Sequence, residues 1–337
     1  MPAPTKKLYT KEDLSLDACL RPQIWEDYVG QENIKQNLDI ILTAAKERKE
    51  QPEHILFYGP AGLGKTTLAH LVAKEMNASI RVCSGPSVEK VGDLASILTN
   101  LSPGEILFID EEHRLNKMIE EILYPAMESR SLNIIIGKGP SARTLQLELP
   151  PFTLIAATTR MALLSSPLRS RFSGGTFKLE FYSIQEINTI VKQSAFKLET
   201  NITEEASEEI AKRSRFTPRV ANRLLKRCRD YAQINKKPSI DKDTVKKALD
   251  LLNVDKLGLE AADKNLLEIL INKFNGGPVG LQTLAAASSE EVATIEEVYE
   301  PYLIQLGFID RTPRGRLATP HAYEHMGIVY PHQNRLL

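Results

Sequence analysis

The chain has 337 residues, 42% hydrophobic and 26% charged, a balance typical of folded proteins with room for two or three domains. Lysine plus arginine and aspartate plus glutamate each total 43, so net charge gives no global argument for a nucleic-acid partner. No apolar run approaches a membrane span, and residues 1–7 lack the apolar stretch of a signal peptide. Three scattered cysteines predict no disulfide framework, so we expect a cytoplasmic protein without a membrane partner.

Residues 1–19 are polar and predict a flexible N-terminal arm. Residues 34–46 carry an apolar stripe with helical spacing. Residues 54–58 predict a short buried strand and residues 67–74 a helix. Between them, residues 59–66 read GPAGLGKT and fit the nucleotide phosphate loop G-x-x-x-x-G-K-[ST], in the strand–turn–helix setting that this motif requires.

The residue types of this loop suit a triphosphate. Its glycines let consecutive backbone N–H groups face a phosphate beside a helix N-terminus: Gly59, Gly62 and Gly64. Lys65 is expected to reach the β- and γ-phosphates of ATP, Thr66 to ligate Mg²⁺, and Thr67 to lie beside the nucleotide. A glycine-rich turn that binds nothing is the alternative, and the match in context favours the nucleotide site.

An acidic motif follows the phosphate loop. Residues 105–111 read EILFIDE, an apolar strand of the kind that a parallel sheet buries on both faces. Asp110 is expected to join the Mg²⁺ site, and Glu111 to orient and polarise the attacking water. A strand that ends in two carboxylates is common by itself. After a phosphate loop, it predicts a hydrolase.

Further strands, at residues 80–83, 152–157 and 176–182, alternate with helices and predict an α/β domain with a parallel sheet. A β-hairpin interrupts this pattern, with arms at residues 132–136 and 143–149 that flank residues 137–140. The hairpin either packs on its own domain or binds a partner through apolar residues such as Ile134 and Ile136. The pattern alone does not separate these two interpretations.

The remainder of the chain predicts two further domains. Helical periodicity at residues 184–198, 203–214, 218–234 and 242–252 predicts a helical domain over residues 183–257. Helices at residues 263–274, 281–287 and 294–306, followed by strands at 308–310 and 316–318, predict a winged helix over residues 258–337. This last domain has six Lys or Arg against ten Asp or Glu, so a protein-binding winged helix is the alternative to a DNA-binding one. A local basic patch at its hairpin favours DNA: Arg311, Arg314 and Arg316.

Several further segments carry a family resemblance. They are residues 20–22 (LRP), 157–160 (ATTR), 164–172 (LSSPLRSRF), 217–223 (TPRVANR) and 311–316 (RTPRGR). Together with the phosphate loop, they closely resemble the RuvB family of bacterial Holliday-junction branch-migration motors, in the AAA+ class, in one register from about residue 20 to beyond residue 322. The resemblance implies an AAA+ ATPase domain over residues 20–182, then the helical lid and a winged-helix DNA-binding domain. It also implies a hexameric ring on duplex DNA, driven by ATP, that acts in recombination and DNA repair.

The resemblance assigns roles to single residues. Thr158 or Thr159 would be the sensor of the γ-phosphate or of the attacking water. Arg171 would be an arginine finger that reaches the ATP of a neighbouring subunit, and Arg219 would be a second sensor in the lid. Three residues would line the adenine side of the nucleotide: Leu20, Arg21 and Tyr182.

The same resemblance implies partners. The hairpin over residues 132–149 would dock RuvA, the junction-binding partner, with RuvC resolvase in a larger complex. The wing arginines would contact the phosphates of the duplex arms of the junction. The chain departs from the family pattern at Glu112, where an apolar residue is usual, and at Phe216, where a glycine is usual; residues 173–175 add one residue after the finger.

Rival functions are another AAA+ machine such as a clamp loader or protein unfoldase, a nucleotide-switched DNA-binding protein without motor activity, and a kinase. The winged helix with its arginine patch disfavours the first. The presence of Asp110, Glu111 and Arg171 disfavours the second, and the lid with its TPR segment (residues 217–219) disfavours the third.

Overall fold

The structure is a computed structural model that describes residues 19–136 and 143–331. The described chain forms two compact units that divide between Phe181 and Tyr182. Residues 1–18 of the predicted arm and the hairpin segment 137–140 lie outside the described residues.

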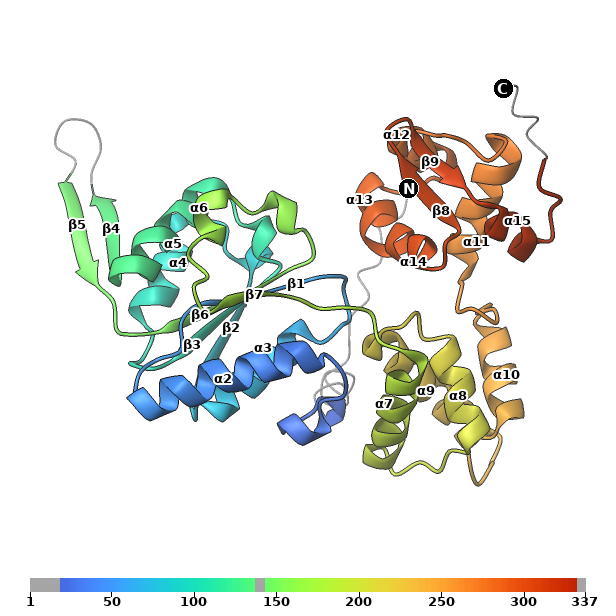
Figure 1. The fold of residues 1–337 in the computed structure, drawn as a ribbon, viewed down its shortest axis with the longest axis horizontal. Coiled ribbons are helices and arrows are strands. Elements are labelled where there is room, and N and C mark those ends of the chain that lie inside the picture. Colours follow the sequence, from blue (N-terminus) through green and yellow to red (C-terminus); the bar gives the residue numbers. More distant parts are fainter. Residues whose placement is uncertain (1–18, 137–142, 332–337) are drawn as a thin grey trace. The chain divides into compact units, whose positions relative to one another are not determined.

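A five-stranded parallel sheet forms the centre of the first unit, in the order β2-β3-β6-β1-β7 (Figure 1). The strands are β1 (Ile55–Tyr58), β2 (Ile80–Ser84), β3 (Ile106–Asp110), β6 (Thr153–Thr158) and β7 (Gly175–Lys178). The three middle strands are almost wholly buried, as expected where helices cover both faces of a sheet. The predicted α/β fold with a parallel sheet is confirmed.

The predicted length of the last strand is wrong. The sequence predicts a strand that reaches residue 182, but β7 ends at Lys178. Its neighbour β1 ends at Tyr58, where the chain turns into the phosphate loop. The N–H of Leu179 makes a last bond to the carbonyl of Tyr58 at 2.8 Å, and the described chain offers no strand beyond that point.

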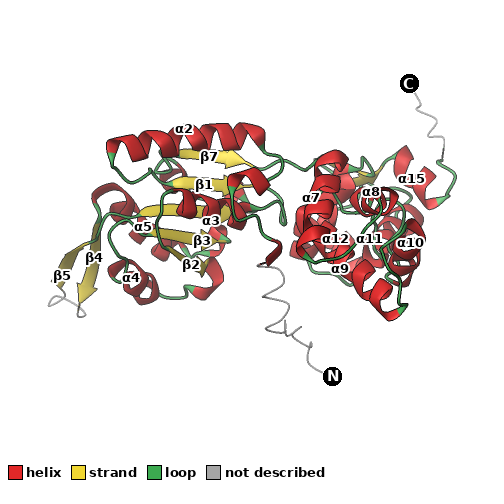
Figure 2. Cartoon of the chain, turned by 90° about the horizontal axis from the view of Figure 1, so that it is seen from below, coloured by secondary structure: helices red, strands yellow, loops and turns green. Residues whose placement is uncertain are grey.

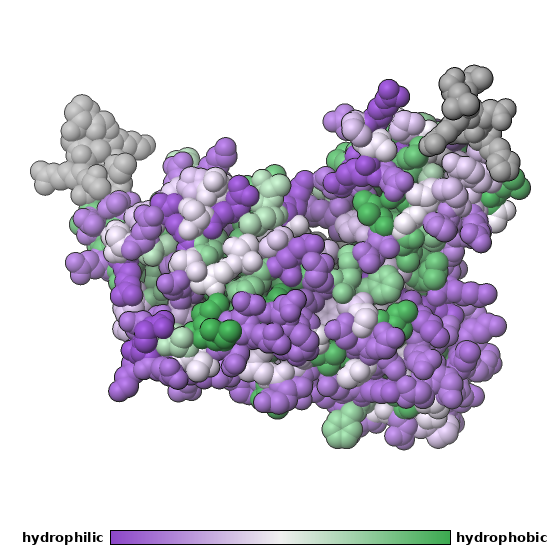
Figure 3. Space-filling view, viewed as in Figure 1, coloured by the Kyte–Doolittle hydropathy of each residue, from purple (hydrophilic) through white to green (hydrophobic). Residues whose placement is uncertain are grey.

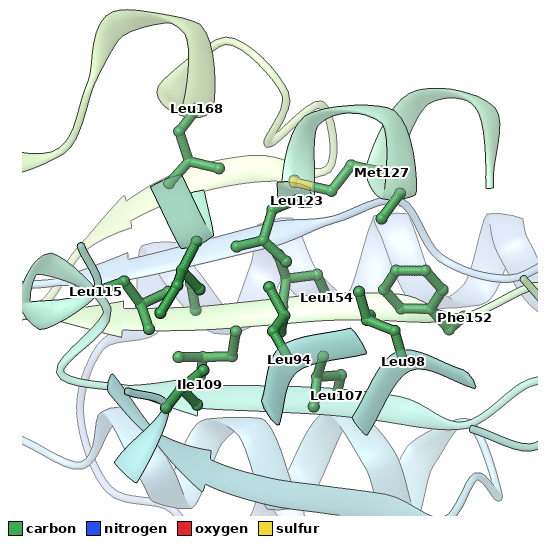
Figure 4. Packing of buried hydrophobic residues seen from close by; sticks show 14 of the residues in the cluster. Leu94, Leu98, Leu107, Ile109, Leu115, Leu123, Met127, Phe152, Leu154 and Leu168 are labelled. Carbon is green, nitrogen blue, oxygen red and sulfur yellow. The ribbon is translucent and has the colours of Figure 1, made fainter. Parts of the chain in front are cut away.

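Helices cover the sheet on two sides (Figures 1 and 2). Helices α2 (Glu32–Arg48) and α3 (Lys65–Glu75) pack on one face, and α4 (Val91–Thr99), α5 (Lys117–Ser129) and the short α6 (Ser166–Arg169) on the other. The sequence pattern had not predicted helices at α4 or α5. Leu94 and Leu123 from these helices pack against Leu107 of β3 and Leu154 of β6 (Figure 4). This burial fixes the carboxyl ends of the strands, where the motif residues lie.

Short 3₁₀ turns complete the unit: η1 (Trp25–Asp27), η2 (Gly85–Ser87), η3 (Glu112–Arg114) and η5 (Met161–Leu163).

The predicted hairpin is present as a separate two-stranded sheet, β4 (Ser131–Ile136) with β5 (Arg143–Glu148). Its base is anchored, because Leu132 and Leu149 are buried in the core that α4 and α5 also enter. Leu145, further along β5, is 44% exposed. Figure 1 shows the strands projecting away from the five-stranded sheet, so the base of the hairpin belongs to the core, whereas Leu145 lies outside it.

The second unit begins with four helices that form the predicted lid: α7 (Ile184–Lys197), α8 (Glu204–Lys212), α9 (Pro218–Ile234) and α10 (Lys242–Leu251). Pro218 stands at the first position of α9, and the Asp241 carboxylate caps α10 by accepting a hydrogen bond from the N–H of Thr244 at 2.7 Å.

A winged helix follows. Its elements are α11 (Ala261–Glu268), π-helical η6 (Ile269–Lys273), α12 (Leu281–Ser288), α13 (Val292–Thr294), π-helical η7 (Ile295–Tyr299), α14 (Glu300–Gln305), β8 (Ile309–Thr312), β9 (Gly315–Ala318) and α15 (Pro320–Met326). The predicted helix over residues 294–306 is interrupted by η7, and α15 was not predicted. The hairpin β8–β9 is the predicted wing.

Hydrophilic residues cover most of the face shown in Figure 3. Large apolar side chains are exposed at the ends of two lid helices, where Phe196 is 85% and Ile234 80% exposed. Within residues 19–136 and 143–331, no helix combines the length and the apolar character needed to cross a membrane.

Candidate active site and nucleic-acid interface

The phosphate loop joins β1 to α3, as predicted. Gly59, Gly62 and Gly64 all have positive φ, at 137°, 84° and 101°. A Cβ on Gly59 would lie 2.7 Å from the carbonyl oxygen of Leu179, so only glycine fits there. The buried ammonium of Lys65 donates to the carbonyls of Gly59 at 2.8 Å and of Pro60 at 2.9 Å, which holds it inside the loop.

Asp110, at the carboxyl end of β3, meets this loop. Its Oδ2 accepts a hydrogen bond from Thr66 Oγ1 at 3.1 Å, and its Oδ1 accepts one from the N–H of Glu111 at 3.0 Å. A hydroxyl and a carboxylate are hard oxygen ligands, which suit Mg²⁺. Among the described residues, no group of three His, Cys, Asp or Glu side chains could hold a metal. Protein sites typically hold Mg²⁺ with one or two carboxylates plus nucleotide oxygens and waters.

The two candidate sensor residues differ in their contacts. Thr158 is fully buried at the end of β6; its Oγ1 accepts a hydrogen bond from the N–H of Arg160 at 3.0 Å and lies 3.0 Å from His113 Nδ1. The Oγ1 of Thr159 is also buried, but has no hydrogen-bond partner among the described residues. Thr158 is therefore committed within the fold, whereas the hydroxyl of Thr159 is available.

His113 is a residue of this site that the sequence analysis did not identify. Its side chain is 4% exposed, and its Nε2 lies 3.5 Å from Glu111 Oε2. Its position two residues after Glu111 is the one signal in the sequence that could have suggested it.

The proposed adenine-side residues fall on both units. A cavity of about 160 Å³ in the first unit is lined by Arg21, Pro22, Gln23, Thr67, His70, Leu71 and Lys74, and so brings Arg21 and Thr67 together. Leu20 is buried. In the second unit, Tyr182 is buried and its N–H donates to the carbonyl of Phe216. Arg219 is exposed in the first turn of α9.

The proposed finger, Arg171, follows α6 and is partly covered. Its guanidinium lies 4.6 Å from the ring centroid of Tyr124, forms an ion pair with Glu128 at 2.9 Å, and donates to the carbonyl of Pro167 at 2.6 Å. The side chain is 19% exposed. A role on another subunit's nucleotide would require Arg171 to release Glu128.

The wing arginines share one carboxylate. Arg316 donates through Nε and Nη2 to both oxygens of Glu300 at 3.0 Å, and Arg311 Nε donates to Glu300 Oε1 at 3.0 Å. Burial raises the pKa of Glu300, but the hydrogen bonds from the two arginines outweigh it, and the pKa lies below its ordinary value. The side chain of Arg316 is only 13% exposed, against 52% for Arg311; Arg314 is exposed at the turn.

Two residues that depart from the family pattern have distinct surroundings. Glu112 is 1% exposed, and neither of its carboxylate oxygens has a hydrogen-bond partner among the described residues. Burial raises the pKa of Glu112 to about 8, and the nearby Glu120 carboxylate adds to the effect. Phe216 has a φ of 55°, a conformation that favours glycine, and its ring lies 6.0 Å from that of Tyr302 in the winged helix. The side chains of Ile134 and Ile136 lie outside the described part of the structure.

Comparisons with known proteins agree with this arrangement. The family model of the Holliday junction DNA helicase RuvB P-loop domain matches residues 20–178. The RuvB AAA lid domain model matches residues 182–255, and the RuvB C-terminal winged helix domain model matches residues 256–327.

Solved structures agree as well. The Thermotoga maritima RuvB Holliday junction branch migration motor is 48% identical over 93% of this chain and 100% of its own, with a TM-score of 0.85. A mutant of Thermotoga maritima RuvB, also 48% identical over 93% of this chain and 99% of its own, gives a TM-score of 0.86. The chain therefore belongs to the RuvB family of Holliday-junction DNA helicases, with a P-loop ATPase domain, a lid and a winged helix in that order.

Proposed function

We propose that this RuvB-family helicase hydrolyses Mg²⁺-ATP and uses the energy to drive branch migration of Holliday junctions. The observation that carries the proposal is the convergence of Lys65, Thr66, Asp110 and Glu111 at the carboxyl ends of β1 and β3. Side chains that cradle phosphate, bind Mg²⁺ and activate water thus share one edge of the sheet, as phosphoryl transfer to water requires.

Within this site, each residue has a separate task. Lys65, released from the loop carbonyls, binds the β- and γ-phosphates, while Thr66 and Asp110 hold Mg²⁺. When bound, Mg²⁺ neutralises the charge that develops on the phosphate oxygens. The Glu111 carboxylate, 35% exposed, orients and polarises the attacking water.

We assign the sensor role to Thr159 rather than Thr158. Its buried hydroxyl has no partner among the described residues, and a buried polar group without a partner is costly unless a ligand satisfies it. The oxygen of a γ-phosphate, or of the attacking water, would be that partner.

The proposal includes a homohexameric ring on duplex DNA. Arg171 would act as an arginine finger on a neighbouring subunit's ATP, and Arg219 as the second sensor of the lid. Leu20, Arg21, Thr67 and Tyr182 would enclose the adenine side of the nucleotide.

The proposed partners follow from the family. Of the three wing arginines, Arg314 and the half-exposed Arg311 would bind the phosphates of the duplex arms without reading bases, while Arg316, tied to Glu300, would hold the wing in place. The projecting hairpin, through Ile134 and Ile136, would dock RuvA, and RuvC resolvase would join a larger complex. A cytoplasmic location would suit this work and the scattered cysteines.

The test is ATP turnover with and without a four-way junction and RuvA, for the wild type and two variants. Glu111→Gln should bind ATP but stop turnover, because it keeps the phosphate cradle and loses the base. Lys65→Ala should weaken nucleotide binding itself. Normal turnover in Glu111→Gln would refute the assignment, and the absence of branch migration by the wild type would refute the motor function.

A further inference from the structure

His113 lies between the end of β3 and the end of β6. The left-handed conformation of Glu111, with φ of 55°, starts the 3₁₀ turn η3, and the N–H of Arg114 bonds back to the carbonyl of Glu111 at 2.9 Å. This tight turn directs the His113 ring toward β6, where it is almost completely buried. A Cβ on Gly85 would come within 2.3 Å of the same Glu111 carbonyl, so the turn is closely confined.

The contacts of Thr158 indicate which nitrogen of the His113 imidazole carries the proton. Its Oγ1 accepts a hydrogen bond from the N–H of Arg160 at 3.0 Å. The other group within hydrogen-bond distance of this oxygen, among the described residues, is His113 Nδ1 at 3.0 Å. With Nδ1 as the acceptor of this contact, the single hydroxyl proton of Thr158 is hydrogen-bonded as well as its lone pair. A neutral imidazole that accepts at Nδ1 carries its proton on Nε2.

Nε2 faces the proposed base. The distance from His113 Nε2 to Glu111 Oε2 is 3.5 Å, longer than an ordinary N–H···O hydrogen bond. Catalytic hydrogen bonds are often long without substrate and shorten in the substrate complex. The Glu111 side chain is 35% exposed, so we expect it to have room to rotate and shorten this distance.

We propose that His113 is a positioning residue for ATP hydrolysis, which joins the Thr158 hydroxyl to the Glu111 carboxylate and holds that carboxylate in the direction of the attacking water. The inference rests on the proposed role of Glu111. It connects the ends of β6 and β3 through one chain of contacts, Arg160–Thr158–His113–Glu111.

Two substitutions separate the two halves of the link. His113→Asn keeps a polar group near the position of Nδ1, for Thr158, but has no donor that reaches Glu111. His113→Gln places an amide N–H near the position of Nε2 and so keeps the donor to Glu111. We expect kcat for ATP to fall by about tenfold or more in His113→Asn, with KM and nucleotide affinity nearly unchanged, as is typical for loss of a group that orients a functional ligand. His113→Gln should recover much of that loss.

Thr158→Val tests the other end of the chain. It should lower kcat, and its effect combined with His113→Asn should be smaller than the product of the two separate effects, since both act through one contact chain. His54→Gln is the matched control. His54 is partly buried in this domain, accepts a hydrogen bond from the N–H of Leu154 at 2.8 Å, and lies 3.2 Å from the carbonyl of Met127, so its replacement should lower stability but not kcat per folded molecule.

The experiment is steady-state ATP turnover by the full chain with junction DNA, together with nucleotide affinity and thermal unfolding of each variant. A normal kcat in His113→Asn, or equal kcat in the Asn and Gln variants, overturns the inference. If His113→Asn does not fold, Thr158→Val decides, and a normal kcat there overturns it as well. Turnover that is lost in Glu111→Gln but normal in every His113 variant refutes this inference alone, whereas normal turnover in Glu111→Gln refutes the proposed function.

Discussion

At the scale of single residues, the most unusual feature is the buried carboxyl of Glu112. It stands next to the two carboxylates proposed to bind Mg²⁺ and to activate water, yet it faces the interior, and its oxygens lack hydrogen-bond partners among the described residues. A buried charge without a partner is strongly unfavourable, so the side chain is protonated at neutral pH, in line with its raised pKa. We therefore expect Glu112 to affect stability rather than Mg²⁺ binding.

This makes the stability of the P-loop domain depend on pH. The pKa of Glu112 is raised from 4.5 to about 8 in the folded protein. Between these values the unfolded chain ionises and the folded chain does not, so the stability falls as pH rises, by up to ~1.4 kcal/mol per pH unit. Glu112→Gln should remove this slope. The measurement is chemical denaturation between pH 5.5 and 8.5, without Mg²⁺.

Removing a surface carboxylate provides the control. Glu121→Gln, at an exposed position of the neighbouring helix α5, should leave the slope in place. Identical slopes for the wild type and Glu112→Gln would mean that Glu112 does not titrate in this range.

At the scale of elements, the wing combines a structural and an exposed arginine. Arg316 is tied to both oxygens of the buried Glu300 and has little exposed surface, whereas Arg314 is exposed at the turn. The ion pairs of Arg311 and Arg316 with Glu300 fix the wing on α14. Arg314 and Arg316 should therefore respond differently to substitution, although the sequence presents them as equivalent.

We expect Arg314→Ala to reduce the salt slope of log DNA affinity by ~0.9, the effect of one lost phosphate contact, with equal losses on two unrelated duplexes. Arg316→Ala should instead destabilise the winged helix by about 1.5–3 kcal/mol, because it removes charged hydrogen bonds from a buried carboxylate. Affinity measured against salt, with thermal unfolding, separates the two effects. A slope unchanged in Arg314→Ala would favour a protein-binding winged helix.

At the scale of the whole molecule, the proposed ring depends on Arg171. In the single chain, its guanidinium is held by Glu128 and the ring of Tyr124. These contacts hold the Arg171 side chain against its own subunit, just after α6. In the ring, Arg171 would release them and bind the phosphate of a neighbouring subunit's ATP. Hydrolysis would then require assembly, which is a property of several copies rather than of one.

Mixing experiments test this dependence. Arg171→Ala should bind ATP nearly normally but hydrolyse it poorly, because a finger supplied by a neighbour contributes ~10³–10⁵ in rate. Added to wild type, it should reduce activity by more than its fraction of the mixture. Arg169→Ala, at an exposed position two residues away, is the matched control. Activity that falls only in proportion to the fraction of Arg171→Ala would show that Arg171 does not act across an interface.

The sequence by itself determined what local patterns encode. The phosphate loop, the acidic strand end and the helical periodicity of the lid and winged helix each occupy a short stretch of chain, so the fold class and a candidate nucleotide site could be predicted from them. The family was predicted from further short segments such as residues 164–172. Some secondary-structure elements could not be predicted from local patterns. Helices α4, α5 and α15 were missed, and β7 was predicted too long because its end depends on where β1 stops.

Only the tertiary structure decided which groups meet. Thr158 and Thr159 are adjacent and identical in the sequence, but one hydroxyl contacts a histidine 45 residues away and the other has no partner among the described residues. Packing between elements also buries Glu112, and it brings Arg311 and Arg316 into hydrogen bonds with Glu300. Contacts between distant residues depend on the register and packing of whole elements, and no local pattern specifies them.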